Sequence, residues 1–214
     1  DSQSITVTVN AVNDAPTANA AVGETNEDES IVIVLSGDDV DGDALIFSLD
    51  SDATNGTVTL DGALATYAPN ANYNGDDSFT FSVTDGEYIA TADVSVSIAA
   101  VNDAPVLAAV SDVSFDEDGS GDLSLSAGDV DGDDLTFSIT GGSDITATLS
   151  GSDVSFSAPE NYNGSETFTV SVTDGELSDS QSITVTVNAV NDAPVLASVG
   201  NRNVDEDNTL IILL

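Results

Sequence analysis

The sequence contains no cysteine, histidine, lysine, methionine or tryptophan, and these absences exclude several kinds of chemistry. Without cysteine, no disulfide can stabilise a small domain. Without histidine and cysteine, the imidazole and thiolate ligands that zinc and copper prefer are missing, and so are the usual partners of a catalytic nucleophile. Oxygen ligands remain in abundance, and these suit calcium or magnesium.

Basic charge is almost absent as well. Arg202 stands against 39 aspartate and glutamate residues, so the formal net charge is -38. Such a chain repels the phosphate backbone of nucleic acid and anionic membrane surfaces, which excludes both as partners. No stretch approaches the roughly 20 apolar residues of a membrane-spanning helix, so we expect no membrane insertion. Because self-repulsion destabilises a compact state, the sequence predicts cations as its partners.

An internal repeat organises the chain. The pentapeptide Val-Asn-Asp-Ala-Pro begins at Val12, Val101 and Val190, at a constant spacing of 89 residues. Residues 1–16 are also identical to residues 179–194. Chance does not produce such a pattern, so the sequence predicts an array of repeats whose neighbours meet end to end.

The repeat divides the chain into four parts. We expect the C-terminal strand of a preceding repeat and a linker in residues 1–16, and the start of a following repeat in residues 195–214. Two complete repeats are expected between them, in residues 17–105 and 106–194. Since both end parts are incomplete repeats, we expect a parent protein that extends in both directions.

Within each repeat, apolar and polar residues alternate over short segments. Leu135, Phe137 and Ile139 alternate with polar residues, and the same period appears at 79–83 and 94–98. Period two is typical of strands with one buried face. About seven such strands per repeat, without helical periodicity, predict an all-β fold made of tandem immunoglobulin-like β-sandwich repeats of about 89 residues.

Acidic residues gather where the strand pattern breaks. Each complete repeat has an early Glu-Asp pair, a later Asp-x-Asp-Gly-Asp loop and an aspartate at the last hairpin, and an Asn-Asp pair lies in each linker. Three acids within five residues repel one another unless a cation bridges them, and a tight glycine-containing loop can turn their oxygens toward one point. The predicted calcium ligands are Asn13, Asp14, Glu27, Asp39, Asp41, Asp43, Asp85, Asn102, Asp103, Glu117, Asp129, Asp131, Asp133, Asp174, Asn191 and Asp192.

A single loop cannot provide the roughly 6–8 oxygen ligands that calcium takes, so segments from neighbouring repeats would have to converge. An EF-hand is excluded as the explanation of the aspartate loop. Its sixth position requires glycine and its twelfth glutamate, between two helices. Here the sixth position holds Ala44 or Asp134, and the twelfth holds Asp50 or Thr140.

The linker at residues 11–16, Ala-Val-Asn-Asp-Ala-Pro, together with the aspartate loop resembles cadherin repeats. The resemblance is to the bacterial cadherin-like repeats of giant type I-secreted (RTX-type) adhesins, and it extends over the whole chain. It implies calcium held between neighbouring repeats by an early glutamate of one repeat, the linker, and aspartates of the next. The ligands that it implies at the central junction are Glu27, Asn102, Asp103, Asp129, Asp131 and Asp174.

Two features depart from the cadherin pattern. Ala11, Ala100 and Ala189 stand where the first linker acid is expected, and Asn-Tyr-Asn-Gly, at 72–75 and 161–164, replaces an acidic loop. Fewer charged ligands imply about one or two ions per junction. The Asn-Tyr-Asn-Gly stretch itself predicts a structural corner, in which the tyrosine packs its ring and forms a hydrogen bond through its hydroxyl.

The last-hairpin aspartates have two interpretations. Asp85 and Asp174 each precede a glycine between two alternating segments, which predicts a two-residue hairpin turn. Aspartate is an ordinary turn former because its side chain can bond its own backbone. Turn formation and calcium ligation therefore both remain open for these two residues.

The resemblance implies a calcium-stiffened stalk on the bacterial cell surface or in a secreted adhesin, which mediates cell adhesion or biofilm attachment by projecting a distal module. In that family the chain leaves the cell unfolded through a type I channel, and external calcium triggers folding. The alternatives are a polysaccharide- or self-binding module, or a subunit of an extracellular fibre or sheath. We do not expect an enzyme, because catalytic acids would be unique, whereas these acids recur in every repeat.

Overall fold

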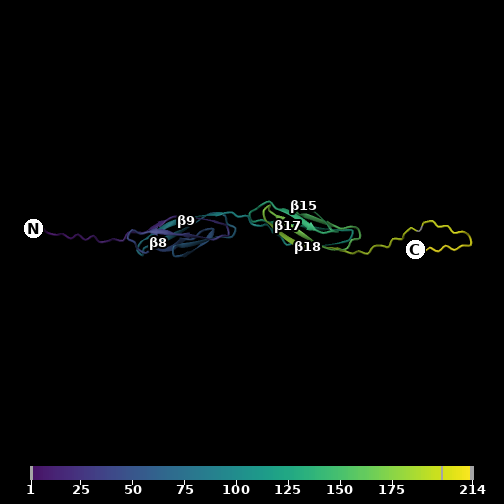
Figure 1. Cartoon of the computed structure of the whole chain (residues 1–214), viewed down its shortest axis with the longest axis horizontal. Coiled ribbons are helices and arrows are strands. Elements are labelled where there is room, and N and C mark those ends of the chain that lie inside the picture. Colours follow the sequence, from purple (N-terminus) through teal and green to yellow (C-terminus); the bar gives the residue numbers. More distant parts are fainter. Residues whose placement is uncertain (1, 199, 213–214) are drawn as a thin grey trace. The chain divides into compact units, whose positions relative to one another are not determined.

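The computed structural model describes residues 2–198 and 200–212, and their regular structure consists of β-strands. The chain divides into two compact units, of which the first ends at Asp103 and the second begins at Ala104 (Figure 1). In the described part of the chain, nothing resembles a membrane-spanning helix. The all-β prediction is confirmed, while the four-part division of the sequence stays a prediction.

Each unit contains nine strand segments within its described residues. The first unit contains β1 (Thr17–Asn19), β2 (Ala21–Asn26), β3 (Ile31–Val34), β4 (Ser36–Asp38), β5 (Ile46–Ser51), β6 (Gly56–Asp61), β7 (Leu64–Pro69), β8 (Gly75–Thr84) and β9 (Ile89–Ala99). The second unit contains β10 (Val106–Leu107), β11 (Val113–Asp116), β12 (Ser120–Ser124), β13 (Ala127–Gly128), β14 (Thr136–Gly141), β15 (Thr146–Ser150), β16 (Asp153–Ser157), β17 (Gly164–Thr173) and β18 (Ser178–Asn188).

Each unit is a sandwich of a four-stranded and a three-stranded sheet with a separate two-stranded pair, and the strand orders of the two units are equivalent. In the first unit, β2-β9-β8-β5 form one sheet, β3-β7-β6 form the other, and β1 pairs with β4. The counterparts in the second unit are β11-β18-β17-β14, β12-β16-β15 and β10-β13. β2 runs parallel to β9, and β11 parallel to β18, whereas the long hairpins β8-β9 and β17-β18 are antiparallel. This is the predicted tandem immunoglobulin-like architecture.

The sequence predicts about seven strands per repeat, and pairing divides them into nine segments. The first strand is split because β1 pairs with β4, after which β2 crosses to the opposite sheet and pairs with β9. The second strand is interrupted at Leu35, a core residue with 2% exposure. The pairing of each strand with its neighbours causes these interruptions. The period-two pattern of side chains carries no information about pairing, so it does not predict them.

The last hairpin differs from its prediction. In the first unit, β8 and β9 end their pairing at Thr84 and Ile89, so the connection has four residues, Asp85–Tyr88, and the predicted two-residue turn is wrong. Oδ1 of Asp85 accepts hydrogen bonds from the backbone N–H groups of Glu87 and Tyr88, both at 2.7 Å. The aspartate side chain thereby satisfies donors that a longer loop would otherwise leave unpaired.

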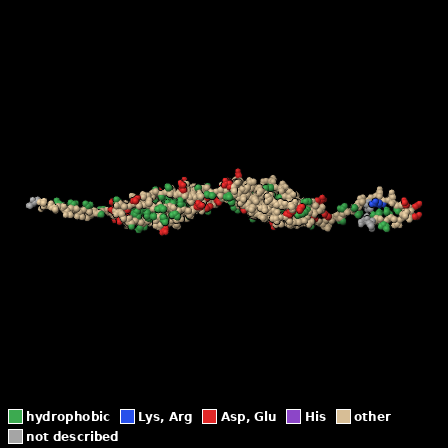
Figure 2. Space-filling view, viewed as in Figure 1, with side chains coloured by type: hydrophobic (Ala, Val, Ile, Leu, Met, Phe, Trp, Pro, Cys, Tyr) green, Lys and Arg blue, Asp and Glu red, His purple; other side chains and the backbone are tan. Residues whose placement is uncertain are grey.

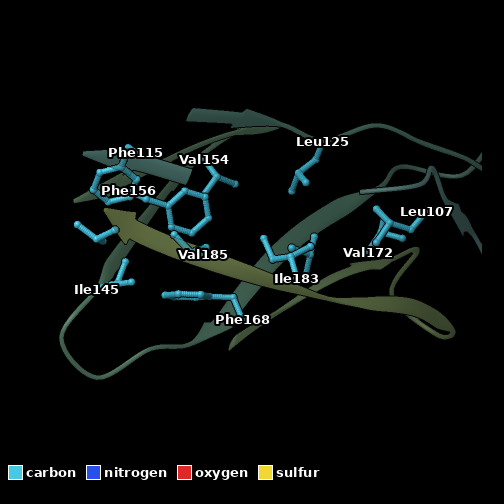
Figure 3. Close-up of a cluster of buried hydrophobic side chains, with 12 residues drawn as sticks. Leu107, Phe115, Leu125, Ile145, Val154, Phe156, Phe168, Val172, Ile183 and Val185 are labelled. Carbon is cyan, nitrogen blue, oxygen red and sulfur yellow. The ribbon is translucent and has the colours of Figure 1, made fainter. Parts of the chain in front are cut away.

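Alternation along the strands places one side chain in two inside each sandwich. Phe79, Phe81 and Val83 of β8 are buried, with exposures of 2%, 0% and 0%. Figure 3 shows the corresponding core of the second unit, in which the rings of Phe156 and Phe168 meet edge to face with centroids 5.3 Å apart. Burial of each such side chain contributes about 1.5–3 kcal/mol to folding.

Candidate metal centre

The aspartate loop of the first unit folds around one carboxylate. Oδ1 of Asp39 accepts the backbone N–H groups of Asp41, Gly42 and Asp43 at 2.9, 3.0 and 3.3 Å. Gly42 has a φ of 82°, a left-handed conformation that glycine adopts without steric cost. This turn gathers the side chains of the three aspartates, so that one carboxylate oxygen from each lies within 4.8 Å of the others.

The second carboxylate oxygen of Asp39 differs from the first in its surroundings. Oδ2 of Asp39 is buried and has no hydrogen-bond partner, and the same holds for Oδ2 of Asp129 in the second unit. A charged oxygen that is removed from water without a donor carries a large desolvation cost. A cation coordinated by this oxygen would remove that cost, and the surrounding ligands are oxygens of the kind that calcium takes. The residues present therefore fit a calcium ion.

The linker that enters the first repeat lies against this loop. The side-chain amide of Asn13 donates to Oδ2 of Asp85 at 3.0 Å, and the backbone N–H of Asp14 donates to Oδ2 of Asp41 at 2.8 Å. The backbone N–H of Tyr88 contributes most to holding the pKa of the Asp85 carboxyl below its ordinary value. One end of the first unit thus brings together six predicted ligands, Asn13, Asp14, Asp39, Asp41, Asp43 and Asp85.

The second unit repeats the loop. Oδ1 of Asp129 accepts the backbone N–H groups of Asp131, Gly132 and Asp133 at 2.9, 3.1 and 3.4 Å. Burial raises the pKa of the Asp133 carboxyl, and the charges of Asp129, Asp131 and Asp174 raise it further. The charge of Asp174 therefore acts on this loop, as do the charges of the two other loop aspartates.

The early glutamates lie at the opposite ends of their units. Glu27 is 4% exposed, and its Oε1 accepts the backbone N–H of Val101 at 2.6 Å, beside the end of β9. In β8 and β9 the pairs at the two ends, Gly75 with Ile98 and Thr84 with Ile89, are nine residues apart. Nine residues of strand span roughly 30 Å. Glu27 and the aspartate loop of the same unit therefore cannot share an ion.

The remaining predicted ligands are Glu117 and the four residues of the Asn-Asp pairs that follow β9 and β18. Glu117 accepts the backbone N–H of Val190 in the same way as Glu27 accepts its partner. Asn102 and Asp103 follow β9 at the end of the first unit and are partly buried. Asn191 and Asp192 follow β18 and are exposed, and the amide of Asn191 donates to the carbonyl of Asp192 at 3.2 Å. Calcium ligation by these residues stays a prediction.

Acidic side chains outside the set of predicted ligands stabilise loops. Oδ1 of Asp28 accepts the backbone N–H of Asn72 at 3.1 Å and so fastens the Asn-Tyr-Asn-Gly corner. In that corner the hydroxyl of Tyr73 donates to the carbonyl of Asp76 at 2.8 Å, and the ring packs against the core, as predicted. Buried Asp77 anchors a further loop. The signal that could have identified Asp77 is its acidic counterpart 89 residues later, Glu166.

Two sandwiches in tandem, each with an acidic loop at one end, define a protein of the immunoglobulin-like repeat class. Residues 13–97 and 102–187 match the family model described as "Bacterial Ig domain". These two matches include most of the sequence, so the chain belongs to the bacterial Ig domain family. Bacterial Ig domains are typically extracellular and typically not enzymes.

Solved structures that resemble this chain include cadherins. Human protocadherin-24 EC1-2 has 16% identity and a TM-score of 0.50, covering 82% of this chain and 100% of that one. Drosophila N-cadherin EC1-3 has 14% identity and a TM-score of 0.38, covering 83% of this chain and 69% of that one. At these identities the likeness shows the fold alone.

A third similar structure is an endo-fucoidan hydrolase from glycoside hydrolase family 107, with 21% identity and a TM-score of 0.36. The match covers 81% of this chain and 29% of the hydrolase, so this chain spans less than a third of that protein's length. No curated protein matches the chain.

Proposed function

We propose that this chain is part of a calcium-stiffened extracellular stalk in a large bacterial surface or secreted adhesin. The observation that carries the proposal is the buried, partnerless Oδ2 of Asp39, in a loop to which the entering linker is already hydrogen-bonded. A cation bound at this oxygen would hold the loop of the repeat in place, and with it the linker that is hydrogen-bonded to the loop. The repeated loop around Asp129 extends the same argument to the second unit.

Calcium would be held in the first unit by oxygens of the aspartate loop, with Asp85 and the linker residues Asn13 and Asp14 beside it. When bound, the ion supplies the positive charge that the loop lacks. The linker residues then lose freedom relative to the repeat that follows, because the groups that they contact are themselves held by the ion. A linker fixed in this way would transmit force and direction along an array of repeats.

The charge of the chain supports a link between calcium and folding. At a net charge of -38, self-repulsion keeps a calcium-free chain expanded, and metal binding at sites absent from the unfolded chain adds its free energy to folding. Such a chain would be exported unfolded by type I secretion and would fold in calcium outside the cell. The stiffened stalk would then hold a distal module away from the surface for cell adhesion or biofilm attachment.

Thermal melts and spin labelling test this proposal on the chain itself. Ligands that bind the folded state alone raise the melting temperature with concentration, so we expect a large rise with calcium over chelator and a small one with magnesium. A nitroxide on Ala11→Cys, next to the linker, is expected to lose mobility when calcium is added. A nitroxide on Ser4→Cys, in the exposed segment before it, is the matched control. Identical melts with calcium and with chelator would reject the metal site.

A melt that rises with calcium, without any change in label mobility at Ala11→Cys, would retain the metal site and reject the stiffening role. Equal changes at both labelled positions would instead indicate a general compaction of the chain. The two measurements therefore separate calcium binding from fixation of the linker.

A further inference from the structure

One edge of the first unit has unpaired backbone groups. In the described part of the chain, β3 pairs with β7 and with no strand on its other side. The backbone N–H of Leu35 donates to the carbonyl of Ala63 at 2.8 Å, so alternate residues before it direct their hydrogen-bonding groups to β7. The N–H and C=O groups of Val32 and Val34, which lie between these residues, point away from β7 to the open edge.

The side chains at this edge are apolar and exposed. Val32 and Val34 are 57% and 68% exposed, and Leu64, which lies opposite Val34 on β7, is 45% exposed. We call these three residues the edge patch. No charged residue occurs from Ser30 to Ser36, although the chain carries 39 acids. Figure 2 shows that, on the face in view, the first unit has more hydrophobic surface than the second.

The second unit has polar residues at the equivalent positions. β12 corresponds to β3, and Asp122 and Ser124 stand where β3 has its two valines. Asp153 lies opposite Ser124, where the edge patch has leucine. Charges on an edge strand prevent another chain from adding to it, because pairing would bury or juxtapose them. The first unit lacks this protection, while an otherwise equivalent edge of the same chain has it.

We propose that a second copy of this chain pairs along β3 of the first unit, in antiparallel orientation. Antiparallel pairing about a two-fold axis is self-complementary: with the axis at Val32, it places Val32 opposite Val32 of the copy and supplies hydrogen bonds to the open edge of both chains. The two three-stranded sheets become one six-stranded sheet, and the two edge patches form one apolar surface.

The charge distribution favours a copy of this chain over a basic partner as the occupant. Two chains with a net charge of -38 repel each other wherever acids face acids, and like charges directly opposite on paired strands are destabilising. The segment from Ser30 to Ser36 is neutral, so a copy can approach there without placing carboxylates against each other. A basic partner would be attracted to the acidic loops, and a neutral edge strand offers it no charge complementarity.

Sedimentation velocity of the full chain tests the pairing. The buffer contains millimolar calcium and about 0.5 M NaCl, at which the Debye length is roughly 4 Å and long-range repulsion is screened. We expect dimers to form as the concentration rises. Val32→Asp with Val34→Ser gives β3 the residues of β12, and we expect it to raise the dimer dissociation constant by at least about tenfold, as like charges oppose each other.

Two further variants make the result specific. Asp122→Val with Ser124→Val removes the protection from β12 and is expected to strengthen association. Ile211→Asp changes an exposed apolar residue outside both units' sheets, at 79% exposure, and is expected to leave the dissociation constant unchanged. A wild-type chain that stays monomeric at every concentration would overturn the proposal. The proposal would also be overturned if Ile211→Asp abolished the association and the β3 variant did not weaken it.

Cysteine cross-linking provides a second measurement, because the chain has no cysteine of its own. Under mild oxidation, Val32→Cys is expected to form covalent dimers faster than Asp122→Cys, its counterpart on β12. Equal rates would contradict the assignment of the interface to β3. Val32 and Val34 point to solvent, so the substitutions leave the core intact, and a melt in the same buffer checks that each variant is folded.

Discussion

The hydroxyl of Tyr67 donates a hydrogen bond to Oδ2 of Asp77 at 2.9 Å, inside the first repeat. The Asp77 carboxylate also accepts the backbone N–H groups of Thr54 and Asn55, so it anchors the loop that leads into β6. Burial, and then the bond to Asp77, raises the pKa of Tyr67 well above its ordinary value. The tyrosine hydroxyl therefore remains a donor over the accessible pH range.

The second repeat anchors the equivalent loop with different residues. Phe156 and Glu166 stand at the equivalent positions, 89 residues later. Glu166 is longer than aspartate by one methylene and accepts the backbone N–H groups of Ser143 and Ile145 at 2.8 and 3.1 Å. In the second repeat the hydroxyl beside this carboxylate comes from Tyr162, whose pKa is raised by burial first and also by a hydrogen bond to Glu166. We therefore expect the positions of Tyr67 and Asp77 to be energetically coupled.

The coupling can be measured in the first repeat. Tyr67→Phe leaves the buried Asp77 carboxylate short of one donor, and we expect it to destabilise the chain by about 1–3 kcal/mol. Adding Asp77→Glu reproduces the pair of the second repeat and is expected to recover part of that loss. Urea unfolding of the single and double variants measures both changes. Additive effects of the two substitutions would contradict the coupling.

Acid is expected to destabilise the second repeat through Glu166. The hydroxyl of Ser143, followed by backbone N–H groups, lowers the pKa of the Glu166 carboxyl from 4.5 to about 2. A lowered folded-state pKa means that the stabilisation is complete above pH 4.5 and is lost as the pH falls from 4.5 toward 2. Glu166→Gln should therefore be less stable than wild type at neutral pH. The difference in the free energy of unfolding should vanish as the pH falls to about 2.

Urea unfolding across this pH range checks the acid prediction. Glu160→Gln makes the same change of charge at an exposed position and is the matched control. We expect the control to follow the wild type at every pH. A constant difference between Glu166→Gln and wild type would show that the effect does not depend on titration of this carboxyl.

The central aspartates should have opposite effects with and without calcium. The double variant Asp39→Asn with Asp129→Asn retains an oxygen that can accept the loop N–H groups, but it removes the charge from the partnerless oxygen. In chelator we expect the melting temperature to stay unchanged or rise, since repulsion is relieved. In calcium we expect most of the calcium-dependent rise to disappear.

Asp61→Asn with Asp153→Asn is the control for this calcium experiment, because both residues are exposed and lie outside the aspartate loops. We expect this control to keep the calcium-dependent rise of the wild type. Retention of the full rise in the Asp39 and Asp129 double variant would reject the candidate metal centre.

The two interpretations of Asp85 can now be separated. Asp85→Asn keeps the oxygen that accepts the N–H groups of Glu87 and Tyr88, so we expect the stability in chelator to change by no more than about 0.5 kcal/mol. If Asp85 is a ligand, loss of its charge should weaken calcium binding at least about tenfold by isothermal titration. Unchanged affinity would assign Asp85 to the turn alone.

Local features were predictable from the sequence, and features that depend on distant pairing were not. The turn around Asp39 is local, because one carboxylate bonds residues two to four positions further along. The separation of Glu27 from that turn depends on the length and direction of β8 and β9. The four-residue hairpin connection depends on where their pairing ends. Side-chain periodicity predicts which face of a strand is buried, but it does not predict where the hydrogen-bonded pairing of two strands ends.

One pair of identical segments shows most directly that the local sequence does not decide whether a strand forms. Residues 2–10 and 180–188 have the same sequence, yet the second segment lies in β18 and the described structure of the first contains no strand. Ile183 is 1% exposed, whereas Ile5, its identical counterpart, is 87% exposed. β18 has β17 and β11 beside it to pair its backbone groups and bury its side chains.

The sequence by itself determined the repeat, the alternation that produces a sandwich and the local turns that gather aspartates, because each depends on residues close together in the chain. The tertiary structure alone decided which carboxylates meet, which end of a unit they occupy and which strand keeps an open edge. These outcomes depend on the partners that each strand finds across the sheet, and a strand without partners has neither a ladder nor a core.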